Sequence, residues 1–446
     1  MNELWASAPR KLLAGWWLLA LVALGASTLF AVVLVVARTP FLGLGGAAFR
    51  TALVLHVDLA VVVWFLTAAA GLWTLAAPVT CCVLRRISRW GMALSAGGIL
   101  ALLLAPLVGS PAPVLANYVP VLDSQLFFVG LLAFLGGIGM AALAALASFS
   151  ARLPVLAKEE GDSSLWRWSI AAAVCVFWLA IVVFMLAQQG ADDALAVDVR
   201  LWGGGHVLQI VHTLMLMAAW FFLGADALRR VAVPGRFLMT LIVIELLTSL
   251  AELAVALSFP VDSPAYRRGF TEVMRWATWP APLALGGVLL TGYYRAFRAE
   301  GLKRVDGCIL FSIALFILGC FVGGTIRGET TAIPAHYHGT VGAVTLAYMA
   351  WGGYFLGRFN LVVTNVWFWR WQPFVYGLGI VLMVIGLAWA GWLGVPRKSP
   401  HVEAMVHGGG YQLAMGIAGI GGLLAIAGAA IFVICILSAV WKQRSR

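Results

Sequence analysis

The sequence predicts an all-α integral membrane protein with about twelve transmembrane helices. Of its 446 residues, 63% are hydrophobic and only 11% are charged, and the mean hydropathy is +0.98. Soluble globular chains carry about 25% charged residues and about 45–50% apolar ones, so this composition excludes a soluble enzyme and a disordered chain. The net charge of +11 does not indicate a nucleic-acid partner, because the basic residues lie in short segments between long apolar runs.

Each predicted helix rests on an apolar run long enough to cross the membrane. A helix of about 18 or more apolar residues spans about 30 Å of hydrocarbon. The longest linkers between such runs, 150–166, 189–204, 260–276 and 395–408, are short, so we expect a single transmembrane domain over residues 1–446. The predicted spans lie near 12–37, 51–77, 90–109, 125–149, 167–188, 205–225, 237–259, 277–298, 308–326, 336–357, 371–394 and 409–440.

The distribution of Lys and Arg predicts that both chain termini lie on the cytoplasmic side. With this orientation, twenty of the 29 basic residues fall in cytoplasmic segments and nine in outer segments. Cytoplasmic loops carry an excess of Lys and Arg, so the count favours this topology. We expect the membrane to be a bacterial inner membrane.

All seven histidines lie near the start of an even-numbered span. Under the predicted topology these spans begin at the outer face, so the seven residues share one layer of the membrane. Ionisable side chains within spans are costly and usually mark function, which favours a cofactor layer over chance placement. For the two histidines of the last outer loop, a surface role is favoured instead. The seven are His56, His206, His212, His336, His338, His401 and His407.

Two of these histidines, His336 and His338, open the tenth span as an H-x-H motif. Helical residues two positions apart point to opposite sides of the helix, so the pair cannot share one metal but can ligate two different cofactors. Neutral imidazole suits iron and copper, and His56, at matching depth on another span, is a candidate partner ligand for one cofactor. The alternative is a pair of interfacial histidines that hydrogen-bond to loop carbonyls.

This layout resembles the haem-copper oxidase superfamily, the large subunit of terminal oxidases and bacterial nitric oxide reductases. The likeness includes the twelve spans and a histidine near the start of the second span and of the sixth span. It also includes the H-x-H motif at the start of the tenth span and a basic pair after the eleventh span. It implies a subunit I-like bundle with two haems, in which His56 and His338 hold a low-spin haem and His336 holds a high-spin haem. Arg397 and Lys398 resemble the basic pair that binds haem propionates through charge-assisted hydrogen bonds; ordinary interfacial bases are the alternative.

The sixth span resembles the family segment whose histidine binds a second metal beside the high-spin haem, and His206 has this position. The tyrosine that many oxidases carry four residues later is Ile210 here, and the adjacent histidine pair of the seventh span is missing near Ala256 and Leu257. A copper or non-haem iron with one imidazole is not expected to be retained. The glycine triplet 203–205 is expected to permit the close approach of a haem or a helix.

Two acids of the seventh span, Glu245 and Glu252, are candidates for a proton relay, because acidic groups inside spans commonly serve such relays. The alternative is a rebuilt iron site in which Glu252 joins His206, with help from His212. Asp58, two residues after His56, is either a group that supports the histidine or an interfacial residue.

The resemblance implies an oxidoreductase subunit of a respiratory-type complex. Electrons would come from an outer-face cytochrome c-type subunit or soluble cytochrome c, pass through the low-spin haem, and reduce dioxygen or nitric oxide at the high-spin haem; other membrane subunits are expected partners. One alternative is a non-catalytic electron-transfer or haem-anchoring subunit of a larger complex. A cofactor-free transporter, which requires discontinuous helices and a midplane site, is the other.

Overall fold

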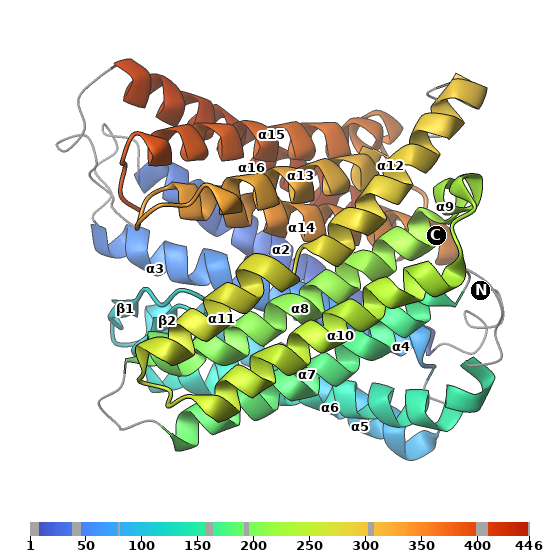
Figure 1. Cartoon of the computed structure of the whole chain (residues 1–446), viewed down its shortest axis with the longest axis horizontal. Helices are drawn as coiled ribbons and strands as arrows, with labels where there is room; N and C mark the ends of the chain where they lie inside the picture. Colours follow the sequence, from blue (N-terminus) through green and yellow to red (C-terminus); the bar gives the residue numbers. More distant parts are fainter. Residues whose placement is uncertain are drawn as a thin grey trace. The chain divides into compact units, whose positions relative to one another are not determined.

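The computed structural model describes residues 9–37, 46–78, 81–156, 164–190, 196–301, 307–397 and 409–444, and helices dominate it (Figure 1). A two-stranded antiparallel hairpin and short 3-10 and π-helical segments complete the described part. The elements are α2 (Arg10–Ala37), α3 (Gly46–Val57), η1 (Asp58–Val63), α4 (Trp64–Ala76), α5 (Cys82–Leu104), η2 (Ala105–Leu107), β1 (Pro113–Val114), β2 (Val121–Leu122), α6 (Gln125–Leu156), α7 (Leu165–Gln189), α8 (Val197–Leu223), α9 (Ala225–Val231), α10 (Gly235–Ser258), α11 (Pro264–Ala277), α12 (Pro280–Glu300), α13 (Gly307–Gly324), α14 (Ala332–Arg358), α15 (Val366–Trp392) and α16 (Gly409–Arg444).

The predicted all-α membrane architecture is confirmed. In the described ranges, ten helical segments are long and apolar enough to cross a membrane. The other two predicted spans, 277–298 and 336–357, correspond to the helices α12 and α14. These helices are less apolar because the last turns of α12 carry Arg295 and Arg298, and α14 contains five glycines, three tyrosines and two histidines.

The prediction that 260–276 is a linker is wrong, because α11 occupies most of it. Ser263 caps this helix: its side chain accepts a hydrogen bond from the backbone N–H of Tyr266 at 3.1 Å. Pro264 fills the first helical position, where its missing N–H has no cost. Ser263 and Pro264 therefore start a helix inside the predicted linker.

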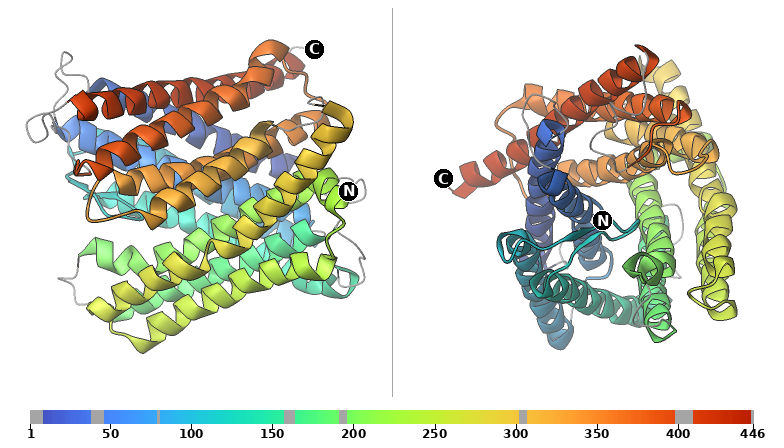
Figure 2. Two further views of the ribbon diagram at one scale, coloured as in Figure 1. Left: turned by 45° about the horizontal axis from the view of Figure 1, so that its top comes forward. Right: turned by 90° about the vertical axis from the view of Figure 1, so that its left-hand side faces the viewer.

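The chain divides into two compact units. In the first unit, α5 pairs with α6 and α7 pairs with α8, while α10 packs against α7, α8 and α11. In the second unit, α13 packs against α14, α14 against α15, and α15 against α16. Both sets of neighbouring helices can be followed in Figures 1 and 2. The first unit comprises Met1–Ala23 and Val57–Gly292, and the second comprises Leu24–His56 and Tyr293–Arg446.

The candidate site residues are distributed between these units. His206, Glu245 and Glu252 belong to the first unit, and His56, His336, His338 and Arg397 belong to the second. All three histidines that are predicted to bind haem therefore lie in one compact part of the chain. Lys398, His401 and His407 fall outside the described residues.

Candidate functional site

The three histidines with predicted haem ligation share one hydrogen-bonding pattern. The Nδ1 atom of His56 lies 3.0 Å from the carbonyl oxygen of Ser27, that of His336 lies 2.7 Å from the carbonyl oxygen of Gly319, and that of His338 lies 2.6 Å from the carbonyl oxygen of Pro334. Because a carbonyl oxygen can only accept a hydrogen bond, each Nδ1 is assigned as the protonated nitrogen. The Nε2 atom of each ring is then the one with a lone pair.

This tautomer is the one that metal-binding histidines commonly adopt, since the ring nitrogen away from the metal donates to a carbonyl or carboxylate. All three side chains are half-buried. Within the described ranges, the Nε2 atoms of His56 and His336 have no hydrogen-bond partner. The Nε2 atoms of His56 and His336 are therefore available as ligand atoms.

Two glycines of α13 allow close contact with α14, and one of them, Gly323, makes room for the ring of His336. A Cβ on Gly323 would lie 2.6 Å from the His336 Nδ1, and one on Gly319 would lie 2.8 Å from the backbone nitrogen of Thr340. His336 donates to this neighbouring helix, whereas His338 donates to a carbonyl one turn back in its own helix. The two rings of the H-x-H motif are thus held by different elements.

Arg397 is tied to the residues that precede α14. Its backbone N–H donates to the carbonyl oxygen of Glu329 at 3.1 Å, and its guanidinium forms an ion pair with the carboxylate of Glu329. Nearby, the backbone N–H of Thr331 donates to the carbonyl oxygen of Val395 at 2.9 Å. These bonds bring the predicted propionate-binding base to the start of the helix that carries His336. A guanidinium has five N–H donors, so pairing with one carboxylate leaves donors for another.

His206 differs from the other three because both of its ring nitrogens are engaged. Its Nδ1 donates to the carbonyl oxygen of Trp202 at 2.8 Å, and its Nε2 accepts from the hydroxyl of Tyr118 at 2.9 Å. The buried ring lies against Tyr118, Trp202 and Phe270, with centroid distances of 4.7, 4.9 and 5.4 Å. A tyrosine hydroxyl therefore contacts the nitrogen that would face a second metal.

Tyr118 is a residue that sequence reasoning missed. It lies in the loop of the hairpin formed by β1 and β2, and the neighbouring Asn117 is held by Asp198 in the first turn of α8. The Asn117 backbone N–H donates to one carboxylate oxygen of Asp198 at 2.6 Å, and its side-chain amide donates to the other at 3.2 Å. Tyr118 and His206 are 88 residues apart, so no local spacing could have revealed the pair.

The glycine triplet before His206 admits aromatic side chains. A Cβ on Gly203, Gly204 or Gly205 would collide with Tyr266, Phe184 or Tyr118, respectively. These rings come from α11, α7 and the hairpin loop. The glycine triplet thus permits aromatic side chains to pack closely against α8 next to His206.

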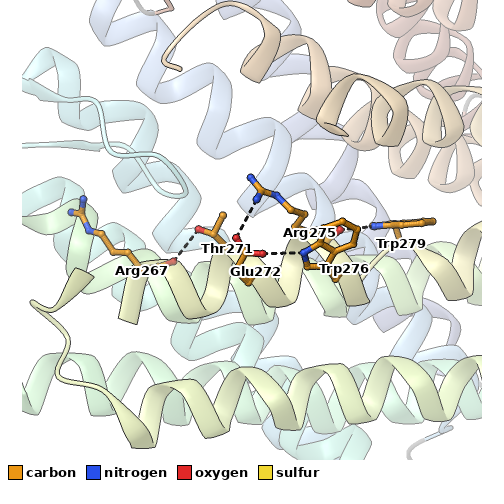
Figure 3. A network of polar contacts seen from close by, with 6 residues as sticks. All are labelled: Arg267, Thr271, Glu272, Arg275, Trp276 and Trp279. Atoms are coloured by element: carbon orange, nitrogen blue, oxygen red, sulfur yellow. Dashed lines mark hydrogen bonds and ion pairs between the residues drawn. The ribbon is translucent and has the colours of Figure 1, made fainter. Parts of the chain in front are cut away.

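The opposite face of α11 carries a polar network (Figure 3). Glu272 pairs with Arg275 at 3.1 Å and accepts from the indole N–H of Trp276 at 2.9 Å. The indole N–H of Trp279 donates to the carbonyl oxygen of Arg275 at 2.7 Å. This network links the end of α11 to the start of α12, and it supports the helix that places Phe270 against His206.

Glu245 and Glu252 are fully buried, and within the described part of the chain none of their carboxyl oxygens has a hydrogen-bond partner. A buried carboxylate without a partner is very costly, so we expect both groups to carry protons. Burial raises the pKa of the Tyr118 hydroxyl well above its usual range.

Two further predicted positions are the buried Asp58 and the half-buried His212. Asp58 is 1% exposed, and its carboxyl oxygens have no partner among the described residues. It is the first residue of η1, a π-helical segment of the kind often found at functional sites. The ring of His212 packs edge-on against Phe65 at 4.9 Å. In the described ranges, no group of three histidine, cysteine, aspartate or glutamate side chains is arranged to hold a metal ion.

The substitution Tyr118→Phe should lower the free energy of unfolding by about 1–3 kcal/mol, because it leaves the buried Nε2 of His206 without a donor. Denaturant or thermal unfolding of the purified protein measures this change. Tyr294→Phe is the matched control, since Tyr294 is 62% exposed and its change should stay within about 0.5 kcal/mol. Equal stability of the two variants would show that the Tyr118–His206 bond contributes nothing.

The substitution Glu252→Leu should not lower thermal stability, because an apolar side chain of similar size removes a buried polar group that has no partner. A role in folding would instead give a clear loss, of about 1–3 kcal/mol for a group with buried hydrogen bonds. The melting temperature in detergent distinguishes the two outcomes. A drop of several degrees would assign Glu252 a structural role.

Solved structures show what the fold is. The chain matches the structure titled "Cryo-EM structure of a heme-copper terminal oxidase dimer provides insights into its catalytic mechanism" with a TM-score of 0.69. The match covers 98% of this chain and 84% of that one at 14% identity. The fold is haem-copper oxidase-like. The predicted subunit I-like membrane bundle is therefore confirmed, and at this identity the likeness extends to the fold alone.

Sequence comparison gives distant relatives without an assigned function. An uncharacterized protein of Rickettsia prowazekii (strain Madrid E) is 25% identical over 498 aligned positions, covering 94% of each chain. An uncharacterized protein of Aquifex aeolicus (strain VF5) is 25% identical, with 75% of this chain and 82% of that one covered. No protein-family model matches the chain.

Proposed function

We propose that the protein is a haem-binding membrane oxidoreductase subunit of a respiratory-type complex. The observation that carries this proposal is the shared hydrogen-bonding pattern of His56, His336 and His338, in which each Nδ1 meets a backbone carbonyl. The haem-copper oxidase-like fold supports it. His56 and His338 would hold a low-spin haem, and His336 would hold a high-spin haem.

The chain would supply imidazole nitrogens and a guanidinium for these groups. Bound haem iron would supply one-electron redox chemistry, with the potential set by its ligands and surroundings. Arg397 would bind a propionate with the donors left by its pairing with Glu329, and Lys398 is the second proposed propionate-binding base. The carbonyl oxygen of Gly319 would keep the ring of His336 in its orientation.

The proposed electron donor is a cytochrome c-type subunit or a soluble cytochrome c at the outer face, and other membrane subunits complete the complex. This arrangement requires both termini on the cytoplasmic side of a bacterial inner membrane, as the Lys and Arg distribution predicts. Dioxygen or nitric oxide is the proposed substrate at the high-spin haem.

A second candidate function is a non-catalytic electron-transfer or haem-anchoring subunit. The observation that favours it is the bond between Tyr118 and the Nε2 of His206, which occupies the ligand lone pair that a second metal would need. In the haem-copper oxidase superfamily, which this chain resembles, the reduction of dioxygen to water ordinarily uses that second metal. Both candidate functions require the two haems, but only the oxidoreductase turns over a substrate.

The experiment that tests the proposal is haem and metal analysis of the purified protein together with turnover assays. Two haems per chain and consumption of dioxygen or nitric oxide would support the oxidoreductase. Two haems without turnover, copper or additional iron would support the electron-transfer subunit. Absence of a Soret band from protein purified with a full haem supply would overturn both.

A further inference from the structure

Arg275 of α11 lies deep inside a membrane span. A Cβ on Gly269 would lie 2.6 Å from the side chain of Val255, and the carbonyl oxygen of Ala277 accepts a hydrogen bond from Thr248 at 3.4 Å. The helix α11 therefore runs antiparallel to α10, which is a candidate span. Because Arg275 is two residues from Ala277, its level is within about 5 Å of the middle of α10 at 1.5 Å per residue.

Contacts with α8, another candidate span, give the same depth. Phe270 lies against Gly203 near the start of α8, and Leu289 of α12 lies against Gly224, which follows the end of α8. The segment that crosses the membrane beside α8 thus begins in α11 and ends in α12. Arg275 is about 7 Å beyond Phe270 and about 21 Å before Leu289 along this segment.

The ion pair that Arg275 forms with Glu272 is exposed at this depth. The side chain of Arg275 is 56% exposed, and that of Glu272 is 45% exposed. Charged side chains inside a membrane are costly and almost always face protein or water rather than lipid. An exposed ion pair in the middle of a span therefore indicates a surface that another molecule covers in the membrane.

The ion pair offers hydrogen-bond donors and needs an acceptor. One carboxylate oxygen of Glu272 pairs with Arg275 at 3.1 Å, and the other accepts from the indole N–H of Trp276 at 2.9 Å (Figure 3). The carbonyl oxygen of Arg275 accepts from Trp279. A guanidinium has five N–H donors, and within the described chain that of Arg275 bonds only to Glu272.

This requirement distinguishes three occupants of the surface. The phosphate and ester oxygens of lipids lie in the headgroup region, outside the hydrocarbon core. A second copy in a symmetric dimer would present the same donors at the same depth, because its Glu272 is already engaged. A transmembrane helix of another protein can present an Asn, Gln, Asp or Glu side chain near its middle, and such side chains hydrogen-bond between helices in membranes.

The same membrane-crossing segment also leaves space for the backbone of a helix. Gly287 is exposed, and no atom of the described chain lies within 4 Å of a Cβ placed on it. It is 11 residues after Trp276, or about three helical turns, so the two share a side. The exposed Thr291 follows one turn later. Small residues at this i, i+4 spacing permit close helix packing in membranes.

We propose that one face of α11 and α12 docks a single transmembrane helix of another protein, whose carboxyl or carboxamide oxygen accepts hydrogen bonds from Arg275. This docking face consists of Glu272, Arg275, Trp276, Gly287 and Thr291. Arginine and tryptophan are the residue types that most often dominate binding at interfaces. The proposal adds a contact surface for a membrane subunit, and it does not depend on whether the chain binds haem.

A synthetic peptide tests the docking face in liposomes. The peptide is a leucine-alanine transmembrane helix of about 22 residues with one central Gln, and energy transfer to the labelled full-length protein measures its binding. It should bind about fivefold more tightly than the same peptide with a central Leu, a ratio equivalent to about 1 kcal/mol. The double variant Glu272→Leu, Arg275→Leu should abolish this preference. Equal binding of the two peptides to the native protein would overturn the proposal.

A second variant tests the space at Gly287. Gly287→Leu should weaken binding of the Gln peptide about fivefold or more, while the protein remains folded because the new side chain meets no neighbour in the described chain. The matched control is Gly97→Leu, which makes the same change at an exposed glycine of α5 with equally open surroundings and should not alter binding. Equal effects of the two substitutions would contradict docking at this face.

Photochemical cross-linking in the native membrane identifies the natural occupant. With benzoylphenylalanine in place of Trp276, the full-length protein should cross-link to a transmembrane helix that carries Asn, Gln, Asp or Glu within one turn of the cross-link. The double variant Glu272→Leu, Arg275→Leu should reduce this product. Products with lipid alone, with a second copy of the chain, or with a helix that lacks such a residue would overturn the proposal, whether or not the preparation contains haem.

Discussion

The substitution His338→Ala should remove the low-spin haem and reduce the haem content from two per chain to one. His56→Ala should have the same effect, because each variant deletes one of the two nitrogens proposed to hold this iron. The haem proposed for His336 should remain, since that ring is held separately by the carbonyl oxygen of Gly319. Pyridine-haemochrome quantification and the visible spectrum of the reduced protein measure the loss.

Two controls separate loss of a ligand from loss of the fold. His212→Ala changes a histidine whose described contact is with the ring of Phe65, and it should retain both haems. Added imidazole should restore part of the low-spin spectrum of His338→Ala, because the free ligand can enter the space left by the side chain. An unchanged spectrum in both His56→Ala and His338→Ala would exclude the assigned ligand pair.

The substitution Gly323→Ala should selectively weaken the binding of the proposed high-spin haem. The new Cβ would lie 2.6 Å from the Nδ1 of His336, so the ring must move and its bond to Gly319 is lost. Loss of a partner that orients a metal-binding histidine typically lowers affinity about 10- to 100-fold. Titration of the haem-depleted protein with haem, followed in the Soret region, measures this change.

Gly324→Ala is the matched control for this substitution. It adds the same methyl group to the neighbouring residue of α13, where no atom lies within 4 Å of the new Cβ. Alanine is also favoured over glycine in a helix, so stability should not fall. Similar haem affinities of the Gly323→Ala and Gly324→Ala variants would mean that the α13 contact does not position His336.

The sequence predicted the helices well because an apolar run of sufficient length has few alternatives to a membrane helix. The prediction failed where length and hydropathy are weak guides. The segment of α11 was predicted to be a linker because it lies between two apolar runs, although Ser263 and Pro264 are favourable at a helix start. The polar groups that extend along α11 also removed any apolar signal.

The candidate site could be predicted only where its residues share a local pattern. The H-x-H motif of His336 and His338 was visible because two residues on one helix turn have defined directions. The contact between Tyr118 and His206 was not, because it joins a loop to a helix through tertiary packing. The role of Asp198 in holding Asn117 was invisible for the same reason.

The two units therefore suggest different tasks within one chain. The second unit carries the imidazoles proposed to bind haem, and the first carries the buried acids Glu245 and Glu252 and the Tyr118–His206 pair. The stability of Glu252→Leu bears on this view, because a group retained for function is not needed for folding.

The most direct test of the account is electron paramagnetic resonance, combined with near-infrared magnetic circular dichroism, on the oxidised purified protein. The account predicts one low-spin ferric haem with two imidazole ligands and one high-spin ferric haem with a single imidazole, in a 1:1 ratio. A protein that contains no haem, or a low-spin haem whose second ligand is not histidine, would contradict it.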